Sequence, residues 1–253
     1  MDLGLGGRGY LVTGASRGLG LAAAQALVAD GARVLVNSRS AGAVDAAVAS
    51  LGGAPAAHGL AADLTDADAA DRLVAAVRDR LGRVDGVLVS VGGPEPGTVL
   101  DTAEQAWRDG VESVLLGPLR LVRALLPHLG EGAAIGFVLS TSARQPLPGL
   151  AVSNGLRPGL AMTAKQLADE LAPRGVRVVG LLPGTFATEL VVGREDASGD
   201  PARARACAEA GIPLGRVGEP AEFGRVAAFL LSPAASYVTG TTLAVDGGRL
   251  RAP

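Results

Sequence analysis

The segment that most constrains the fold lies near the start of the chain, where a glycine-rich turn joins an apolar run to a helical pattern. The run at 9–12 leads into Thr13-Gly14-Ala15-Ser16-Arg17-Gly18-Leu19-Gly20, and the helical pattern follows at 19–30. A strand, a tight turn and a helix in this order are typical of a βαβ unit, in which parallel strands are joined through helices. The segment therefore predicts a parallel sheet.

The same alternation of short apolar runs and longer helical patterns continues to the end of the sequence. Seven runs have the length of strands, at 9–12, 33–37, 57–62, 84–89, 134–139, 177–182 and 242–245. Six longer patterns are helical, at 19–30, 44–51, 66–81, 102–129, 152–171 and 220–231. We expect one doubly wound, Rossmann-type α/β domain over 1–253, with about seven parallel strands and helices on both faces. The stretch 184–212 is the least regular, and is either a mobile cover over a site or a surface insertion.

The composition narrows the class of function. A hydrophobic fraction of 48% allows a sizeable core, and a net charge of −2 gives no basic patch for nucleic acid or a membrane surface. No apolar stretch reaches the roughly 20 residues of a membrane span, and no secretory signal is visible. The single cysteine, Cys207, excludes an internal disulfide and a multi-cysteine metal site. These features predict a cytoplasmic protein that acts on a small molecule, without nucleic acid, membrane or metal.

The glycine-rich turn itself predicts a phosphate site. Glycines let the backbone bend sharply, so that its N–H groups approach a pyrophosphate at the positive end of the following helix. The position between the first strand and the first helix makes the pattern far more specific than a glycine triplet alone. The turn residues predicted to hold a dinucleotide are Gly14, Ser16, Arg17, Gly18, Leu19 and Gly20.

The end of the second strand favours NADP(H) over NAD(H). An acidic residue there would accept hydrogen bonds from the ribose of NAD, but this chain has Asn37-Ser38-Arg39. A 2′-phosphate carries about two negative charges and is attracted by arginine. Arg17 and Arg39 could bind this phosphate from two sides, and we predict that all three residues at 37–39 contact the cofactor.

Several further motifs stand in a recognisable order along the chain. Asp63-Leu64 follows the third strand, Ser90-Val91-Gly92 follows the fourth, and Pro183-Gly184-Thr185-Phe186-Ala187-Thr188 follows the sixth. With the turn at 13–20 and the patterns at 213–220, 237–240 and 246–248, the chain resembles the short-chain dehydrogenase/reductase superfamily almost end to end. The resemblance implies further cofactor contacts, at Asp63, Leu64, Ser90, Gly92, Arg157, Pro183, Gly184, Phe186 and Thr188.

The resemblance fails at the residues that usually transfer protons. Members of this superfamily use a Ser, a Tyr and a Lys four residues after the Tyr, assisted by an Asn. The Tyr position is Ser153, the Lys position is Arg157, and the Asn position is Val114. Only the Ser is kept, and the spacing assigns it to Ser140, thirteen residues before Ser153.

The residues left in these positions still suggest a site. Ser153 and Arg157 are four residues apart and share one helix face. Arg157 keeps a positive charge that can bind ribose or polarise a carbonyl, although arginine is a poor proton donor. We therefore predict Ser140, Ser153 and Arg157 as catalytic residues. Tyr10, Tyr237 and Lys165 are placed where they cannot replace the missing pair.

Three functions remain open from the sequence. The first is an NADP(H)-dependent oxidoreductase for a small carbonyl, alcohol, enone or imine, since the cofactor carries the hydride chemistry. The second is a non-redox enzyme on the same scaffold, such as a lyase, isomerase or cyclase, and the third is a non-catalytic NADP(H)-binding protein. The resemblance also implies a homotetramer or dimer, formed through the helices at 102–129 and 152–171 and the last strand.

Overall fold

The computed structural model describes residues 2–251 and contains one parallel sheet in the order β3-β2-β1-β4-β5-β6-β7. Its strands are β1 (Gly9–Val12), β2 (Arg33–Ser38), β3 (Ala57–Ala61), β4 (Val84–Val89), β5 (Leu129–Val138), β6 (Arg177–Pro183) and β7 (Thr241–Val245). The central strands β1 and β4 are buried at every residue. Strands covered on both faces are apolar throughout instead of alternating, which explains the continuous runs in the sequence.

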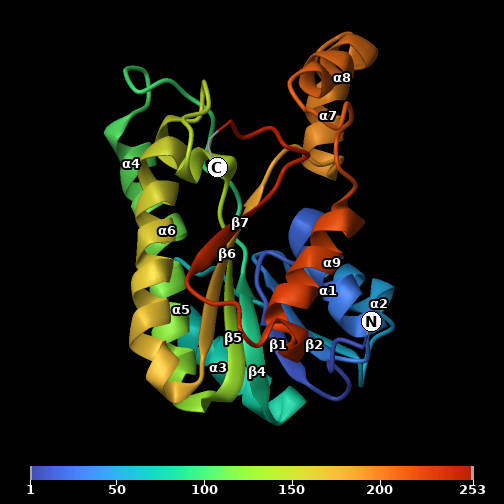
Figure 1. Cartoon of the computed structure of the whole chain (residues 1–253), viewed down its shortest axis with the longest axis vertical. Coiled ribbons are helices and arrows are strands. Elements are labelled where there is room, and N and C mark those ends of the chain that lie inside the picture. Colours follow the sequence, from blue (N-terminus) through green and yellow to red (C-terminus); the bar gives the residue numbers. More distant parts are fainter. Residues whose placement is uncertain (1, 252–253) are drawn as a thin grey trace.

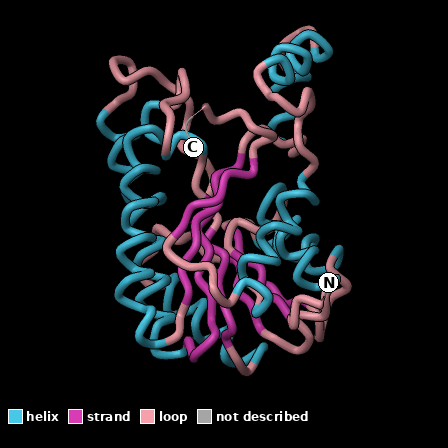
Figure 2. Tube along the Cα trace, in the orientation of Figure 1, coloured by secondary structure: helices cyan, strands magenta, loops and turns pink. Residues whose placement is uncertain are grey.

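Helices cover both faces of this sheet, as Figure 2 shows. The α-helices are α1 (Gly18–Ala29), α2 (Ala41–Ser50), α3 (Ala69–Leu81), α4 (Glu104–Gly110), α5 (Gly117–Leu125), α6 (Ala151–Leu171), α7 (Glu189–Asp196), α8 (Pro201–Ala210) and α9 (Pro220–Leu231). A π-helix, η1 (Val111–Leu116), and the 3₁₀ turns η2 (Leu126–His128), η3 (Thr141–Ala143), η4 (Ala172–Arg174) and η5 (Pro233–Ala235) complete the set. One core lies between the sheet and α1, α2 and α9, and the other lies under α3, α5 and α6 (Figure 1).

The predicted doubly wound sheet with helices on both faces is confirmed, but two segments differ from the prediction. The region 102–129 is not one helix, because the π-helix η1 interrupts it. Pro118, at the start of α5, has no N–H to donate to the carbonyl four residues earlier, so the α-helical ladder loses a hydrogen bond next to the π-helix. The last residue of the region, Leu129, already belongs to β5, where it pairs with Val84.

The second difference is the stretch 184–212, which contains the helices α7 and α8. No residue of either helix is buried, so the segment lacks the apolar periodicity from which a helix is predicted. Arg205 of α8 donates to both carboxylate oxygens of Glu195 in α7, at 2.9 and 2.8 Å. The pair projects beyond the carboxyl end of the sheet (Figure 1).

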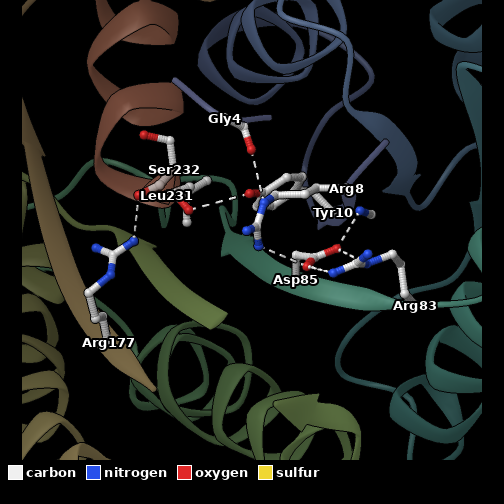
Figure 3. A network of polar contacts seen from close by, with 9 residues as sticks. Gly4, Arg8, Tyr10, Arg83, Asp85, Arg177, Leu231 and Ser232 are labelled. Carbon is white, nitrogen blue, oxygen red and sulfur yellow. Dashed lines mark hydrogen bonds and ion pairs between the residues drawn. The ribbon is translucent and has the colours of Figure 1, made fainter. Parts of the chain in front are cut away.

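Polar side chains at the amino end of the sheet form a closed network (Figure 3). Asp85 in β4 accepts hydrogen bonds from the Gly9 amide at 2.8 Å, from Arg8 at 3.0 Å and from Arg83 at 2.6 and 2.5 Å. Arg177 in β6 reaches the carboxyl end of α9 and binds backbone carbonyls there. These contacts tie β1 to β4, and β6 to α9, at the amino end of the sheet.

None of the helices within residues 2–251 is long and apolar enough to cross a membrane.

Candidate functional site

The site lies at the carboxyl ends of β1 and β4, where the strand order changes direction. Ligands of doubly wound sheets bind in the crevice at such a point. The Thr13 hydroxyl ties the two strand ends together, because it donates to the Ser90 carbonyl at 2.7 Å and accepts from the Ser90 amide at 2.9 Å. Gly14 has φ +56°, and a Cβ there would lie 2.5 Å from the Ser90 oxygen. Only glycine fits between these two strands.

The glycine-rich turn leads directly into α1. A Cβ on Gly20 would lie 2.3 Å from the carbonyl oxygen of Gly14, so the helix can pack this closely only with glycine. Arg17 is the N-cap residue, but its side chain does not cap the helix, and the first turn of α1 has no acidic residue. The first N–H groups of the helix therefore have no capping side chain, and a helix N-terminus of this kind can bind an anion.

The segment after β6 passes over this turn. An added Cβ on Gly18 would lie 3.6 Å from the side chain of Thr188, so the structure brings two predicted cofactor residues together from distant parts of the chain. Phe186 packs differently from its neighbours, because its ring meets Phe223 edge-on at 5.8 Å between centroids and is buried. Its backbone alone is left for the predicted cofactor contact.

Three predicted cofactor residues lie at or just after the end of β2, and they differ in burial and hydrogen bonding. Asn37 is buried, and its amide nitrogen donates to the carbonyls of Leu60 and Ala62 at 3.0 Å each, so it secures the end of β3. The Ser38 hydroxyl is buried and has no hydrogen-bond partner. Arg39 is exposed and lies 4.0 Å from the carboxylate of Asp63.

Two serine hydroxyls meet at the end of β5. Ser142 Oγ lies 2.9 Å from Ser153 Oγ, and both side chains are buried. The serine chosen by spacing, Ser140, instead caps η3 by accepting from the Ser142 amide at 3.1 Å. Sequence reasoning missed Ser142, although the run Ser140-Thr141-Ser142 contains both hydroxyls. A serine side chain is much shorter than a tyrosine side chain, and the hydroxyl of Ser153 contacts Ser142, not the predicted Ser140.

Arg157 lies on α6 one turn after Ser153. One of its terminal nitrogens donates to the Val138 carbonyl at 2.7 Å, while Nε is buried without a hydrogen-bond partner. No carboxylate of residues 2–251 forms an ion pair with it. Burial lowers the pKa of Arg157 to about 10, so at neutral pH this is a buried cation with an open hydrogen-bond donor.

The other candidate proton donors lie elsewhere. Tyr10 is buried at the opposite end of the sheet (Figure 3), where burial and the charge of Asp85 raise its pKa to about 12. Tyr237 is fully exposed just before β7. Lys165 forms an ion pair with Asp169. Val114 is fully buried in η1.

The crevice has the properties that a dinucleotide requires. Ser38 Oγ and Arg157 Nε are the buried side-chain atoms without partners within the described chain, and they lie at the carboxyl ends of the sheet on either side of the glycine turn. Buried polar atoms are almost always bonded, so each indicates a missing partner. Beside Gly92 and Gly93 an added Cβ would meet no atom within 4 Å, which leaves open space next to the turn. The residues present therefore fit a nucleotide cofactor.

Comparison with known proteins agrees with this geometry. A family model described as enoyl-(acyl carrier protein) reductase matches residues 14–249. The chain is 37% identical over 249 residues to the L-rhamnose 1-dehydrogenase (NAD(P)(+)) of Azotobacter vinelandii, with 94% of each chain covered. It is 32% identical over 249 residues to the 3-oxoacyl-(acyl carrier protein) reductase of Vibrio cholerae, with 96% and 98% covered.

A solved structure with the same fold is L-sorbose reductase from Gluconobacter frateurii complexed with NADPH and L-sorbose. It matches with a TM-score of 0.94 and 28% identity over 100% of both chains. The doubly wound sheet, the glycine turn and these matches define the class of the protein as a Rossmann-type oxidoreductase that binds a nicotinamide dinucleotide. The chain belongs to the short-chain dehydrogenase/reductase superfamily.

Proposed function

We propose that this protein is an NADP(H)-dependent oxidoreductase that acts on a small carbonyl or alcohol, with Ser153 and Arg157 in place of the usual Tyr and Lys. The observation that carries the proposal is the pair of unbonded polar atoms, Ser38 Oγ and Arg157 Nε, beside an intact glycine turn. The L-rhamnose dehydrogenase and the L-sorbose reductase among its relatives act on sugars. A hydroxylated carbonyl compound is therefore a suitable first substrate class.

The cofactor would be held along the whole crevice. The N–H groups at the start of α1 would bind the pyrophosphate, and Arg17 and Arg39 would bind the 2′-phosphate, with Ser38 donating to the same end. Asp63 already accepts from the Thr65 amide at 3.0 Å, so it would support the adenine side mainly through its turn. Arg157 would donate from Nε to the nicotinamide ribose. The segment after β6 would cover the nicotinamide through its backbone and Thr188.

The chemistry divides between cofactor and chain. Bound NADPH supplies the hydride. Ser140 and Ser153 would orient the carbonyl oxygen and pass a proton to it through water, and the charge of Arg157 would stabilise negative charge that develops on that oxygen. A serine hydroxyl is far less acidic than an activated tyrosine. Loss of general acid catalysis lowers a rate by about 10²- to 10⁴-fold, so we expect slow turnover on unactivated ketones.

The first experiment is a titration of the purified protein with NADPH and, in parallel, with NADH. We expect NADPH to bind more tightly, and Arg39→Ala to narrow the preference by about tenfold through loss of a charged hydrogen bond. Arg78→Ala removes another exposed arginine, from α3, and should leave both affinities unchanged.

The outcomes separate the three functions. Binding of NADPH, followed by oxidation of the bound NADPH when a carbonyl compound is added, supports the proposal. Turnover of a substrate without any change in nicotinamide absorbance would indicate a non-redox enzyme, and tight binding with no turnover of any kind would indicate a non-catalytic binding protein. If neither nucleotide binds at millimolar concentration, the oxidoreductase proposal is wrong.

We also propose that the protein assembles as a homodimer or homotetramer. Much of the apolar face of the helical region 102–129 packs inward, since Val122 and Leu125 are fully buried. Leu116 and Met162 remain exposed on η1 and α6, and Leu243 and Tyr237 are exposed on and before the edge strand β7. Light scattering of the purified protein measures the mass directly, and a monomer would contradict the proposal.

A further inference from the structure

The segment that follows β7 is held against the sheet. Residues 246–251 turn back across the carboxyl end of the sheet, between the base of the α7–α8 pair and the start of α6 (Figure 1). Asp246 fixes this turn, because its carboxylate accepts from the amides of Gly248 at 2.8 Å and Leu250 at 2.7 Å. Both carboxylate oxygens of Asp246 are therefore hydrogen-bonded to backbone amides of the turn.

The segment 246–251, which we call the crossing segment, is packed on both sides. A Cβ on Gly184 would lie 2.7 Å from Asp246 Cα, so the loop after β6 accepts the segment only because it has glycine there. Gly247 accepts a backbone hydrogen bond from Leu214 at 3.1 Å. At the far end, Leu250 is partly buried against the core under α3, α5 and α6. The segment thus has a defined position over the crevice.

The crossing segment places one cation, Arg249, beside the loop after β6. Its guanidinium donates to the hydroxyl of Thr185 at 2.5 Å, and the side chain is partly exposed. Within residues 2–251 no carboxylate lies within ion-pair distance of it. A guanidinium has five N–H donors in a planar fork that matches a carboxylate or phosphate, and a neutral hydroxyl uses only part of this capacity.

The position of Arg249 separates it from the predicted cofactor phosphates. Arg17 and Arg39 follow β1 and β2, whereas Thr185 follows β6, three strands further along the sheet from β1. Ser142 and the α6 residues Ser153 and Arg157 gather at the carboxyl end of β5, one of the two strands between β1 and β6. A molecule that reaches these residues and extends toward β6 meets Arg249 rather than the glycine turn.

We propose that Arg249 is a specificity-determining residue that binds an anionic group of the substrate, a carboxylate or a phosphate, beside the reacting carbonyl. This inference rests on the proposed oxidoreductase function and deepens it. A neutral sugar offers no charge to the guanidinium, so the preferred substrate is an oxo acid or a phosphorylated carbonyl compound. An Asp or Glu beside Arg249 would have formed an ion pair with it. Without such a pair, the guanidinium can bind an anionic group of a ligand.

The test uses pairs of compounds that differ only in charge. 3-Oxobutanoate, 4-oxopentanoate and 5-oxohexanoate are compared with their methyl esters, both by NADPH oxidation and by calorimetric binding to the protein–NADP⁺ complex. The wild-type protein should prefer at least one acid to its ester. Arg249→Gln removes the charge and keeps a polar side chain, and should lower that preference by about 10- to 100-fold, as loss of a charged hydrogen bond does.

Two variants make the result specific. Arg249→Lys keeps the charge and should retain most of the preference, and Arg251→Ala removes the next, exposed arginine of the crossing segment and should change nothing. Equal binding of every acid and its ester by the wild-type protein would overturn the inference. So would an Arg249→Gln variant whose affinity for NADPH alone falls, because the anion would then belong to the cofactor. Absence of NADPH binding in the wild-type protein would instead defeat the proposed function.

Discussion

Two arginines, Arg157 and Arg177, are buried in the same molecule at opposite ends of the sheet, and they are bonded very differently. Arg177, at the amino end of β6, donates to the carbonyls of Leu230 at 2.8 Å, Ser232 at 2.9 Å and Val238 at 3.2 Å. Arg157, near the carboxyl end of β5, donates to one carbonyl and keeps Nε unbonded. Burial lowers the pKa of both, so both carry a desolvation penalty.

The difference separates a structural arginine from a binding one. The three bonds of Arg177, two of them to carbonyls at the end of α9, offset its desolvation. The open donor of Arg157 receives no such compensation inside the chain, and a buried polar atom without a partner is destabilising. Residues that lower stability in this way persist where a ligand completes them. The buried arginine at the amino end of the sheet therefore stabilises the fold, while the one at the carboxyl end is suited to bind a ligand.

The largest effect is expected from Arg177→Met. The substitution removes three hydrogen bonds, two of them to the buried carbonyls of Leu230 and Ser232 at the end of α9, so we expect a loss of about 3 kcal/mol in the free energy of unfolding. Urea denaturation measures it. Arg123→Met, at an exposed position of α5, is the matched control and should change stability by less than about 0.5 kcal/mol. Equal stability of the two variants would show that Arg177 is not structural.

The opposite result is expected from Arg157→Met. Replacing an unpaired buried cation with an apolar side chain should raise the stability of the cofactor-free protein by about 1 kcal/mol. The same variant should lose much of the thermal stabilisation that NADPH gives the wild-type protein, because stabilisation follows affinity. Thermal unfolding with and without NADPH measures both. A variant that is less stable without NADPH and binds it normally would place Arg157 in the same class as Arg177.

The sequence predicts the features at the carboxyl end of the sheet unequally well. The glycine turn is a local signal, because Gly14 and Gly20 are required by backbone contacts within the first βαβ unit and at its neighbouring strand. The pairing of Ser142 with Ser153 depends on side-chain length and the path of η3, which spacing does not report. The unbonded state of Ser38 and Arg157 depends on every neighbour in space, so no linear pattern contains it.

The pH dependence sharpens the comparison further. The pKa of Arg157 is about 10 in the folded protein and higher in the unfolded chain, so between these values the unfolded chain binds the extra proton. Stability therefore gains from this group as pH rises through about 10, and the buried charge is fully unfavourable below it. The stability advantage of Arg157→Met over the wild-type protein should be constant from pH 7 to 9 and shrink above about 10. A constant difference through pH 11 would show that Arg157 stays charged in the fold.

The smallest effect concerns the two serines at the end of β5. Ser142→Ala removes the partner of the Ser153 hydroxyl, and Ser140→Ala removes the cap of η3, so each should lower stability by only about 1 kcal/mol. Their effects on turnover should differ, because the Ser142 hydroxyl contacts Ser153 while the Ser140 hydroxyl accepts from the Ser142 amide. If Ser140→Ala lowers kcat with NADPH affinity unchanged while Ser142→Ala does not, the Ser153 hydroxyl must turn away from Ser142 when substrate binds. If Ser142→Ala has the larger effect on kcat, the pair found in the structure is the working one, and the spacing rule of the superfamily does not hold for this chain.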